Sequence, residues 1–164
     1  MTEALLNKPY WVIDLLPEQV PENSAGRYFA IERYFLQQPR IADIHRRFTD
    51  ILLKLNCYSD FLVCLSDREQ PVRNPEPERL ASWISAEQKD LCIVLAEEDV
   101  LITLNHDGTC MTVYNPSEAL LDRIGSLAAA HGLFRWQPKQ ENRIGGTDVS
   151  GSAGIAKSRK NVIN

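Results

Sequence analysis

The stretch LCIVLAEEDVLITLNHDGTCMTVY, residues 91–114, decides the fold, because it predicts three antiparallel strands joined by two tight turns. The dipeptide Asp107-Gly108 favours a type I′ turn, in which both central residues take positive φ. A two-residue turn fixes the register of its strands, so Leu104 is expected opposite Met111. The sequence therefore predicts a meander with defined pairing.

Side chains alternate between the two faces of a strand, and one predicted face of the meander is wholly apolar. The other face is mixed, which is compatible with solvent, a short loop or a partner. The apolar face has to be covered by other elements. Its members are Leu91, Ile93, Leu95, Val100, Ile102, Leu104, Met111 and Val113.

Two segments have the helical periodicity that would cover this face. Residues 39–56 begin with a proline suited to a first helical turn and then repeat apolar residues every three or four positions. Residues 116–131 follow a helix-starting NPSE sequence. Strands are expected at residues 10–16, 60–66 and 133–136, and a short helix at 78–85.

The resulting fold class is α+β, with an antiparallel sheet of about five to six strands and helices packed on one face. The element order is β-α-α-β-(α)-β-β-β-α-β. The sequence leaves the strand order open, since the strand at residues 10–16 fits either beside the meander or beside the strand at 60–66.

A helix expected over residues 24–37 is rich in aromatic side chains. Tyr28, Phe29, Tyr34 and Phe35 lie within eight residues, giving a broad apolar face. Core packing is the favoured interpretation for most of them. A helix that contributes to an interface is the alternative.

Composition predicts one domain, residues 1–138, followed by a flexible basic tail, residues 139–164, that lacks aromatic side chains. The domain carries 13 basic and 20 acidic residues, a net charge of −7, and the tail carries a net +3. An acidic domain argues against nucleic-acid binding as the main function. Neither a signal peptide nor an apolar membrane span is recognisable, so a cytoplasmic protein without membrane contact is expected.

Motifs that bind cofactors are missing from the sequence. There is no P-loop, no Rossmann glycine pattern and no nucleophile elbow. His45, His106 and His131 are scattered over different elements, with His45 expected in a solvated basic cluster together with Arg40, Arg46 and Arg47. Four widely spaced cysteines favour reduced thiols. The sequence therefore predicts no cofactor and no metal.

The acidic domain and its order of elements are loosely similar to small bacterial immunity and adaptor proteins. The resemblance implies a non-enzymatic cytoplasmic binding domain, antitoxin- or immunity-like or an adaptor, whose acidic surface engages another, basic protein. The residues expected to bind that partner lie in two polar segments. They are Asp67, Glu69, Glu76, Glu78, Glu97, Glu98 and Asp99.

Two other functions are compatible with the sequence. A small hydrolase or ligand-binding protein would use a polar site near strand ends, formed by Asp14, Asp67 and His106. A structural homo-oligomer would assemble through the mixed face of the sheet or through the edge strand at residues 133–136.

Overall fold

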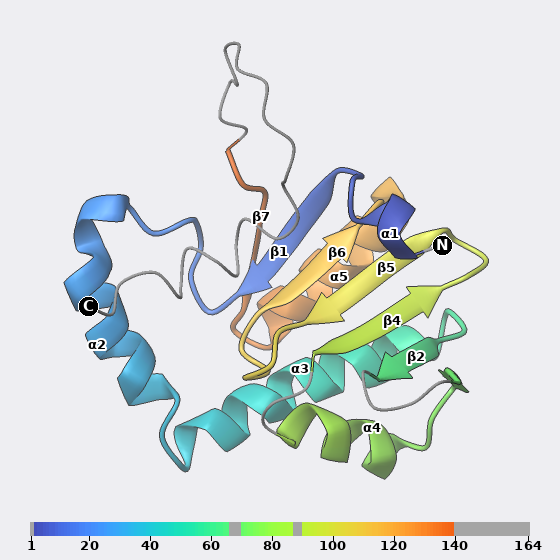
Figure 1. The fold of residues 1–164 in the computed structure, drawn as a ribbon, viewed down its shortest axis with the longest axis horizontal. Coiled ribbons are helices and arrows are strands. Elements are labelled where there is room, and N and C mark those ends of the chain that lie inside the picture. Colours follow the sequence, from blue (N-terminus) through green and yellow to red (C-terminus); the bar gives the residue numbers. More distant parts are fainter. Residues whose placement is uncertain (1, 66–69, 87–89, 140–164) are drawn as a thin grey trace.

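The computed structural model describes residues 2–65, 70–86 and 90–139 (Figure 1). Seven strands form one antiparallel sheet in the order β3-β2-β4-β5-β6-β1-β7. The predicted meander forms its centre, as β4 (Leu91–Leu95), β5 (Val100–Leu104) and β6 (Met111–Tyr114). Leu104 lies opposite Met111, which confirms the predicted register. The α+β class is likewise confirmed.

The remaining strands extend the meander on both sides. β1 (Tyr10–Asp14) pairs with β6, and β7 (Phe134–Trp136) pairs with β1 as an edge strand. On the other side, β2 (Leu62–Leu65) pairs with β4, and β3 (Val72–Arg73) pairs with β2. The strand order that the sequence left open is thereby determined. The count exceeds the expected five to six because the two-residue β3 is too short to show periodicity.

Three helices pack on one face of the sheet: α3 (Arg40–Asn56), α4 (Pro77–Ser85) and α5 (Glu118–Ala130) (Figure 1). Their apolar stripes and the apolar face of the meander form the main core. All eight meander residues predicted for that face belong to it. The largest fully buried side chain of α3 is Phe48.

A fourth helix, which the sequence did not predict, lies on the opposite face of the sheet. In α1 (Thr2–Leu5) the buried Leu5 packs with Val94 and Leu101. This contact closes part of the mixed face, so helices are not confined to one side of the sheet. A four-residue helix was missed because it is too short to display a helical period.

The β5–β6 turn differs from the expected type I′ turn. Gly108 has a φ of +67°, but Asp107 does not take positive φ. Asn105 pairs with Cys110 instead, its N–H donating to the Cys110 carbonyl at 3.1 Å, and this closes a four-residue loop. The Asn105 side chain stabilises the wider loop by accepting the N–H of Thr109 and of Cys110. The register is unchanged, because the numbers of the paired residues add up to the same value in the predicted turn and in the observed loop.

Candidate functional site

Helix α2 (Ala25–Phe35) stands apart from the core, at the left of Figure 1, after a short 3-10 turn (Glu22–Ser24). None of its described side chains is buried, and Ile31 and Tyr34 are each 54% exposed. The expectation that this aromatic-rich helix packs in the core is therefore wrong. Periodicity shows that a stripe is apolar, but it does not show what covers the stripe.

A groove runs between α2 and the body of the domain and encloses about 460 Å³. We call it the α2 groove. One wall is the α2 stripe and the other is the chain that follows β1, so most of the lining is apolar. The lining residues are Asp14, Leu15, Leu16, Val20, Ser24, Arg27, Tyr28, Ile31, Glu32, Phe35, Leu36, Arg47, Thr109 and Gly132.

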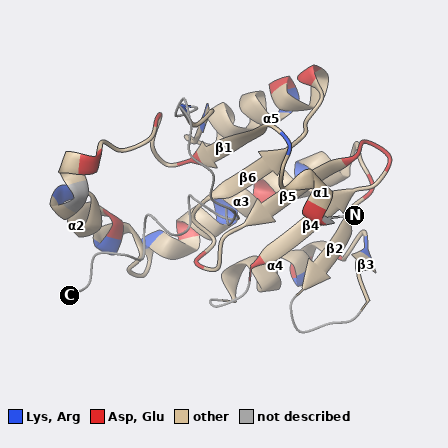
Figure 2. Ribbon diagram, turned by 45° about the horizontal axis from the view of Figure 1, so that its top comes forward, with Lys and Arg blue, Asp and Glu red and all other residues tan. Residues whose placement is uncertain are grey.

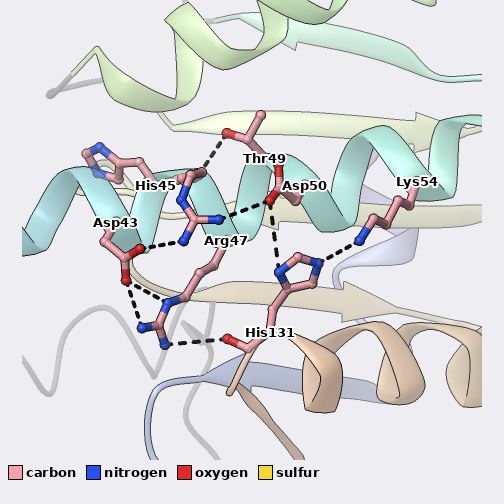
Figure 3. A network of polar contacts seen from close by, with 8 residues as sticks. Asp43, His45, Arg47, Thr49, Asp50, Lys54 and His131 are labelled. Carbon is pink, nitrogen blue, oxygen red and sulfur yellow. Dashed lines mark hydrogen bonds and ion pairs between the residues drawn. The ribbon is translucent and has the colours of Figure 1, made fainter.

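A fixed positive charge lies at the base of the α2 groove. The Arg47 guanidinium contacts Asp43 Oδ2 through Nε at 2.8 Å and through a terminal nitrogen at 2.7 Å. The other terminal nitrogen donates to the His131 carbonyl at 3.4 Å, which ties α3 to the end of α5 (Figure 3). Hydrogen bonds from Arg46 and from Arg47 lower the pKa of Asp43 below its ordinary value. Arg47 is therefore held in place before any ligand arrives.

His45 fastens the β5–β6 hairpin to α3, although the sequence placed it in a solvated cluster. It is 5% exposed, and its Nε2 donates to the Asp107 carbonyl at 2.7 Å. The Thr49 hydroxyl in turn donates to the His45 carbonyl at 2.8 Å. His45 lies four residues after Ile41, which places it at the border of the apolar stripe of α3. Its burial could therefore have been expected from the sequence. The hairpin held in this way supplies Thr109 to the α2 groove.

The structure describes two of the three residues predicted for a hydrolase-like site. Asp14 is buried at the end of β1, lines the α2 groove and accepts the N–H of Leu15 at 2.6 Å. His106 is exposed at the hairpin tip and is not among the described residues that line the groove. Asp67 lies outside the described residues. A catalytic role for this set stays a prediction.

The predicted acidic residues that the structure describes are all exposed. Glu98, in the β4–β5 turn with Glu97 and Asp99, accepts a hydrogen bond from the Ser59 hydroxyl. The Asn74 side chain accepts the N–H of Phe61 at 2.8 Å. This hydrogen bond anchors the segment that leads to Glu76 and Glu78 to the loop that carries Ser59. Asp67 and Glu69 lie outside the described residues.

The described acidic residues of the predicted set lie on two separate segments, the β4–β5 turn and the start of α4. The β4–β5 turn lies at the opposite end from α2 in both Figure 1 and Figure 2. We call the β4–β5 turn, with Glu97, Glu98 and Asp99, the acidic end. The α2 groove and the acidic end are thus two distinct surfaces.

No family model, no curated protein and no solved structure matches this chain. Within residues 2–65, 70–86 and 90–139, no helix is both long enough and apolar enough to span a membrane. The same residues contain no group of three or more His, Cys, Asp or Glu side chains placed to hold a metal ion. The case for function therefore rests on the surfaces themselves.

The imidazole of His131 predicts a pH dependence of stability. Burial and the neighbouring Lys54 ammonium, which donates to Nε2 at 2.9 Å, lower the pKa of His131. Above about pH 6.5 the imidazole is neutral in both the folded and the unfolded chain. Below that pH the unfolded chain takes up the proton more readily, so folding loses stability as the pH falls. We expect His131→Gln to reduce the decrease in Tm between pH 7 and pH 5.

Thermal unfolding followed by circular dichroism at a series of pH values would measure this effect. His106→Gln is the matched control, because His106 is exposed at the hairpin tip. A wild-type pH profile that His131→Gln leaves unchanged would contradict the prediction.

Proposed function

We propose that this protein is an interaction domain that binds a polypeptide segment in the α2 groove, in the manner of an adaptor or immunity protein. The observation that carries the proposal is the exposed apolar stripe of α2, which faces a groove of about 460 Å³. Contiguous apolar surface rimmed by polar groups is typical of protein interaction sites. Ile31 is 54% exposed, so covering the rest of it would contribute about half of the value for a fully exposed side chain, up to about 0.8–1.6 kcal/mol.

The form of the groove favours a polypeptide over a compact ligand. Tyr28, Ile31 and Phe35 line it at i, i+3 and i+7 spacing, the spacing of the anchor residues by which an amphipathic helix packs against a partner polypeptide. At 1.5 Å per residue, the stripe from Tyr28 to Phe35 is about 10 Å long. Arg47 at the base and Arg27 and Glu32 at the wall supply polar groups that would orient a bound segment.

The edge strand β7 adds an apolar side chain next to the groove. Phe134 is 46% exposed and lies opposite Asp14 in the β1–β7 pairing. Because Asp14 lines the α2 groove, Phe134 extends the same surface. Among the described residues β7 is also the outer strand of the sheet, and such an edge can pair with a further strand.

The acidic end is a second candidate for a partner, in this case a basic protein. Glu97, Glu98 and Asp99 follow one another in the β4–β5 turn and are all exposed, so their carboxylates present a combined negative charge. Such a surface would accelerate association with a basic partner and would weaken with added salt.

Site-specific photo-crosslinking in the native cells would test both surfaces. Benzoylphenylalanine would replace Tyr34 beside the groove or Tyr58 at the acidic end, which is 68% exposed. Leu6, also an exposed apolar residue, is the control position. We expect protein adducts from position 34 that Ile31→Glu abolishes and that paired Glu97→Lys and Glu98→Lys substitutions leave intact.

The outcomes separate the two surfaces. Adducts from position 34 that are no more abundant than those from position 6, or that persist with Ile31→Glu, would overturn the groove proposal. Adducts from position 58 that disappear on charge reversal of the β4–β5 turn would support a partner at the acidic end. Since Ile31 is half exposed, its substitution should leave the fold intact, which circular dichroism would verify.

A further inference from the structure

We propose that Cys64 and Cys92 are a reversible modification site, at which a small-molecule disulfide such as oxidised glutathione joins the two thiols in a cross-strand disulfide. The two residues are far apart in the sequence, but β2 and β4 are neighbours in the sheet and place them directly opposite one another (Figure 1). Neither cysteine is among the residues that line the α2 groove, so this site is independent of the proposed function.

The backbone hydrogen bonds show which kind of pair the two cysteines form. Asn74 donates its N–H to the Phe61 carbonyl at 2.9 Å, so the backbone groups of Phe61 point towards β3. The side to which these groups point alternates along a strand, so those of Val63 also point towards β3 and those of Cys64 point towards β4. Cys64 and Cys92 therefore form a pair of the hydrogen-bonded type.

A pair of this type lies within reach of a disulfide. Its Cα atoms are about 5.5 Å apart, and disulfides join Cα atoms separated by about 4.4–6.8 Å. The two side chains project from the same face of the sheet, on which Cys92 packs beside Leu5 of α1 and its neighbours. Their Cβ atoms start roughly 4.5–5.5 Å apart, whereas a disulfide draws them to about 3.8 Å. The bond therefore requires a small local movement, which makes it easier to reduce again.

Both thiols are accessible to a small molecule from solvent, since Cys64 and Cys92 are each partly exposed. Burial, the neighbouring Cys64 and then Asp90 raise the pKa of the Cys92 thiol. The effect of one thiol on the other indicates that the two sulfur atoms are close together. Proximity and access are the two conditions that a thiol pair needs for exchange with a dissolved disulfide.

The other two cysteines are not placed to compete for this bond. Cys110 lies on the same face of the sheet, but β5 separates its strand from β4, so its Cα is about 9–10 Å or more from that of Cys92. Disulfides do not bridge Cα atoms more than about 7 Å apart. Cys57 follows the end of α3, in the layer of helices that covers the other face. Cys57 and Cys110 are therefore internal controls.

The reaction consists of two successive thiol–disulfide exchanges. One cysteine thiolate attacks a sulfur atom of oxidised glutathione, forms a mixed disulfide with it and releases one glutathione thiolate. The other cysteine thiolate then attacks the protein sulfur of the mixed disulfide, forms the Cys64–Cys92 bond and releases the second glutathione. Two protein thiols are oxidised, one glutathione disulfide is reduced to two thiols, and the protons of the cysteines pass to the released glutathione.

The bond would fasten the outer part of the sheet to the meander. Among the described strands, β2 and β3 connect to the rest of the sheet through β4. The chain between the two cysteines contains β3 and α4, so the bond closes a loop around both elements. Closing a loop lowers the conformational entropy of the unfolded chain. We therefore expect the oxidised chain to have a Tm higher than that of the reduced chain by about 5 °C or more.

Peptide mapping of the full-length chain would test the proposal. The folded protein is incubated with oxidised glutathione, and the remaining thiols are then blocked with N-ethylmaleimide in urea. Cleavage before aspartates, including Asp60, Asp67 and Asp99, places the four cysteines in different peptides. We expect the peptides of Cys64 and Cys92 to be joined and the other two cysteines to be blocked. Peptides 64 and 92 that are both blocked, or that each carry glutathione, would overturn the proposal.

Single-cysteine variants test the pairing and its effect on stability. Cys64→Ala and Cys92→Ala should each stop at a mixed disulfide with glutathione and lose the rise in Tm, because the opposing thiol is gone. Cys57→Ala is the matched control, which should form the bond and show the wild-type rise. Circular dichroism of the reduced variants would verify their fold.

Reversal of the bond completes the test. Excess reduced glutathione should return the oxidised wild-type chain to the dithiol form and to its original Tm. A bond that reduced glutathione does not open would overturn the reversible site. An oxidised chain that melts below the reduced one, or a rise in Tm that Cys64→Ala retains, would also overturn the proposal.

Discussion

Phe48→Ala is expected to lower the free energy of unfolding by about 3–5 kcal/mol. Phe48 is fully buried on α3, where it belongs to the core shared with the apolar face of the meander. Its removal loses the transfer free energy of the ring and leaves a cavity that the close-packed surroundings fill only partly. Urea denaturation of the wild-type and variant chains would measure the difference.

Two further variants are controls for this measurement. Phe48→Leu keeps most of the apolar volume and should cost clearly less than alanine at the same position. Phe134→Ala removes an equal ring from a half-exposed position on β7 and should cost below about 1 kcal/mol. Equal costs at positions 48 and 134 would contradict the packing of α3 against the sheet.

Gly108→Ala is expected to lower the free energy of unfolding by about 2–3 kcal/mol. Gly108 has a φ of +67°, a conformation that costs a residue with a Cβ about 1–2 kcal/mol. A Cβ at this position would lie 2.7 Å from Cδ2 and 2.8 Å from Nε2 of His45. The ring must therefore move, and the hydrogen bond from His45 to Asp107 is strained or lost.

A double-mutant cycle would separate backbone strain from the clash. In a His45→Ala background the ring is gone, so Gly108→Ala should cost less, about 1–2 kcal/mol, from its positive φ and from the Ile84 carbonyl, which lies 3.1 Å from the added Cβ. The same cost of Gly108→Ala in both backgrounds would show that the hairpin does not rest on His45. Because this hairpin carries Thr109 into the α2 groove, the single variant should also weaken binding there.

The groove depends on elements that are distant in sequence. The end of β1 supplies one wall, the β5–β6 hairpin supplies Thr109, and α3 supplies Arg47, which the end of α5 holds in place. α2 supplies the other wall. A stable core thus presents a fixed surface opposite a helix that has no buried side chain among those described, and that combination leaves an apolar stripe available to a partner.

The sequence by itself determined the elements whose signal is local. A period of two residues and a tight turn predicted the meander and its register, and a period near 3.6 predicted α3 and α5. The edge strand β7 also appeared where residues 133–136 predicted it. The role of the acidic residues stays a prediction.

Only the tertiary structure decided which apolar and polar side chains are covered. The aromatic stripe of α2 has the same periodicity as a core helix, yet it remains exposed because the sheet face is already filled by α3, α4 and α5. His45 is buried because a hairpin 62 residues later in the chain comes to rest on it. Burial depends on contacts between distant segments, which a local pattern does not contain, and the α2 groove is a product of such contacts.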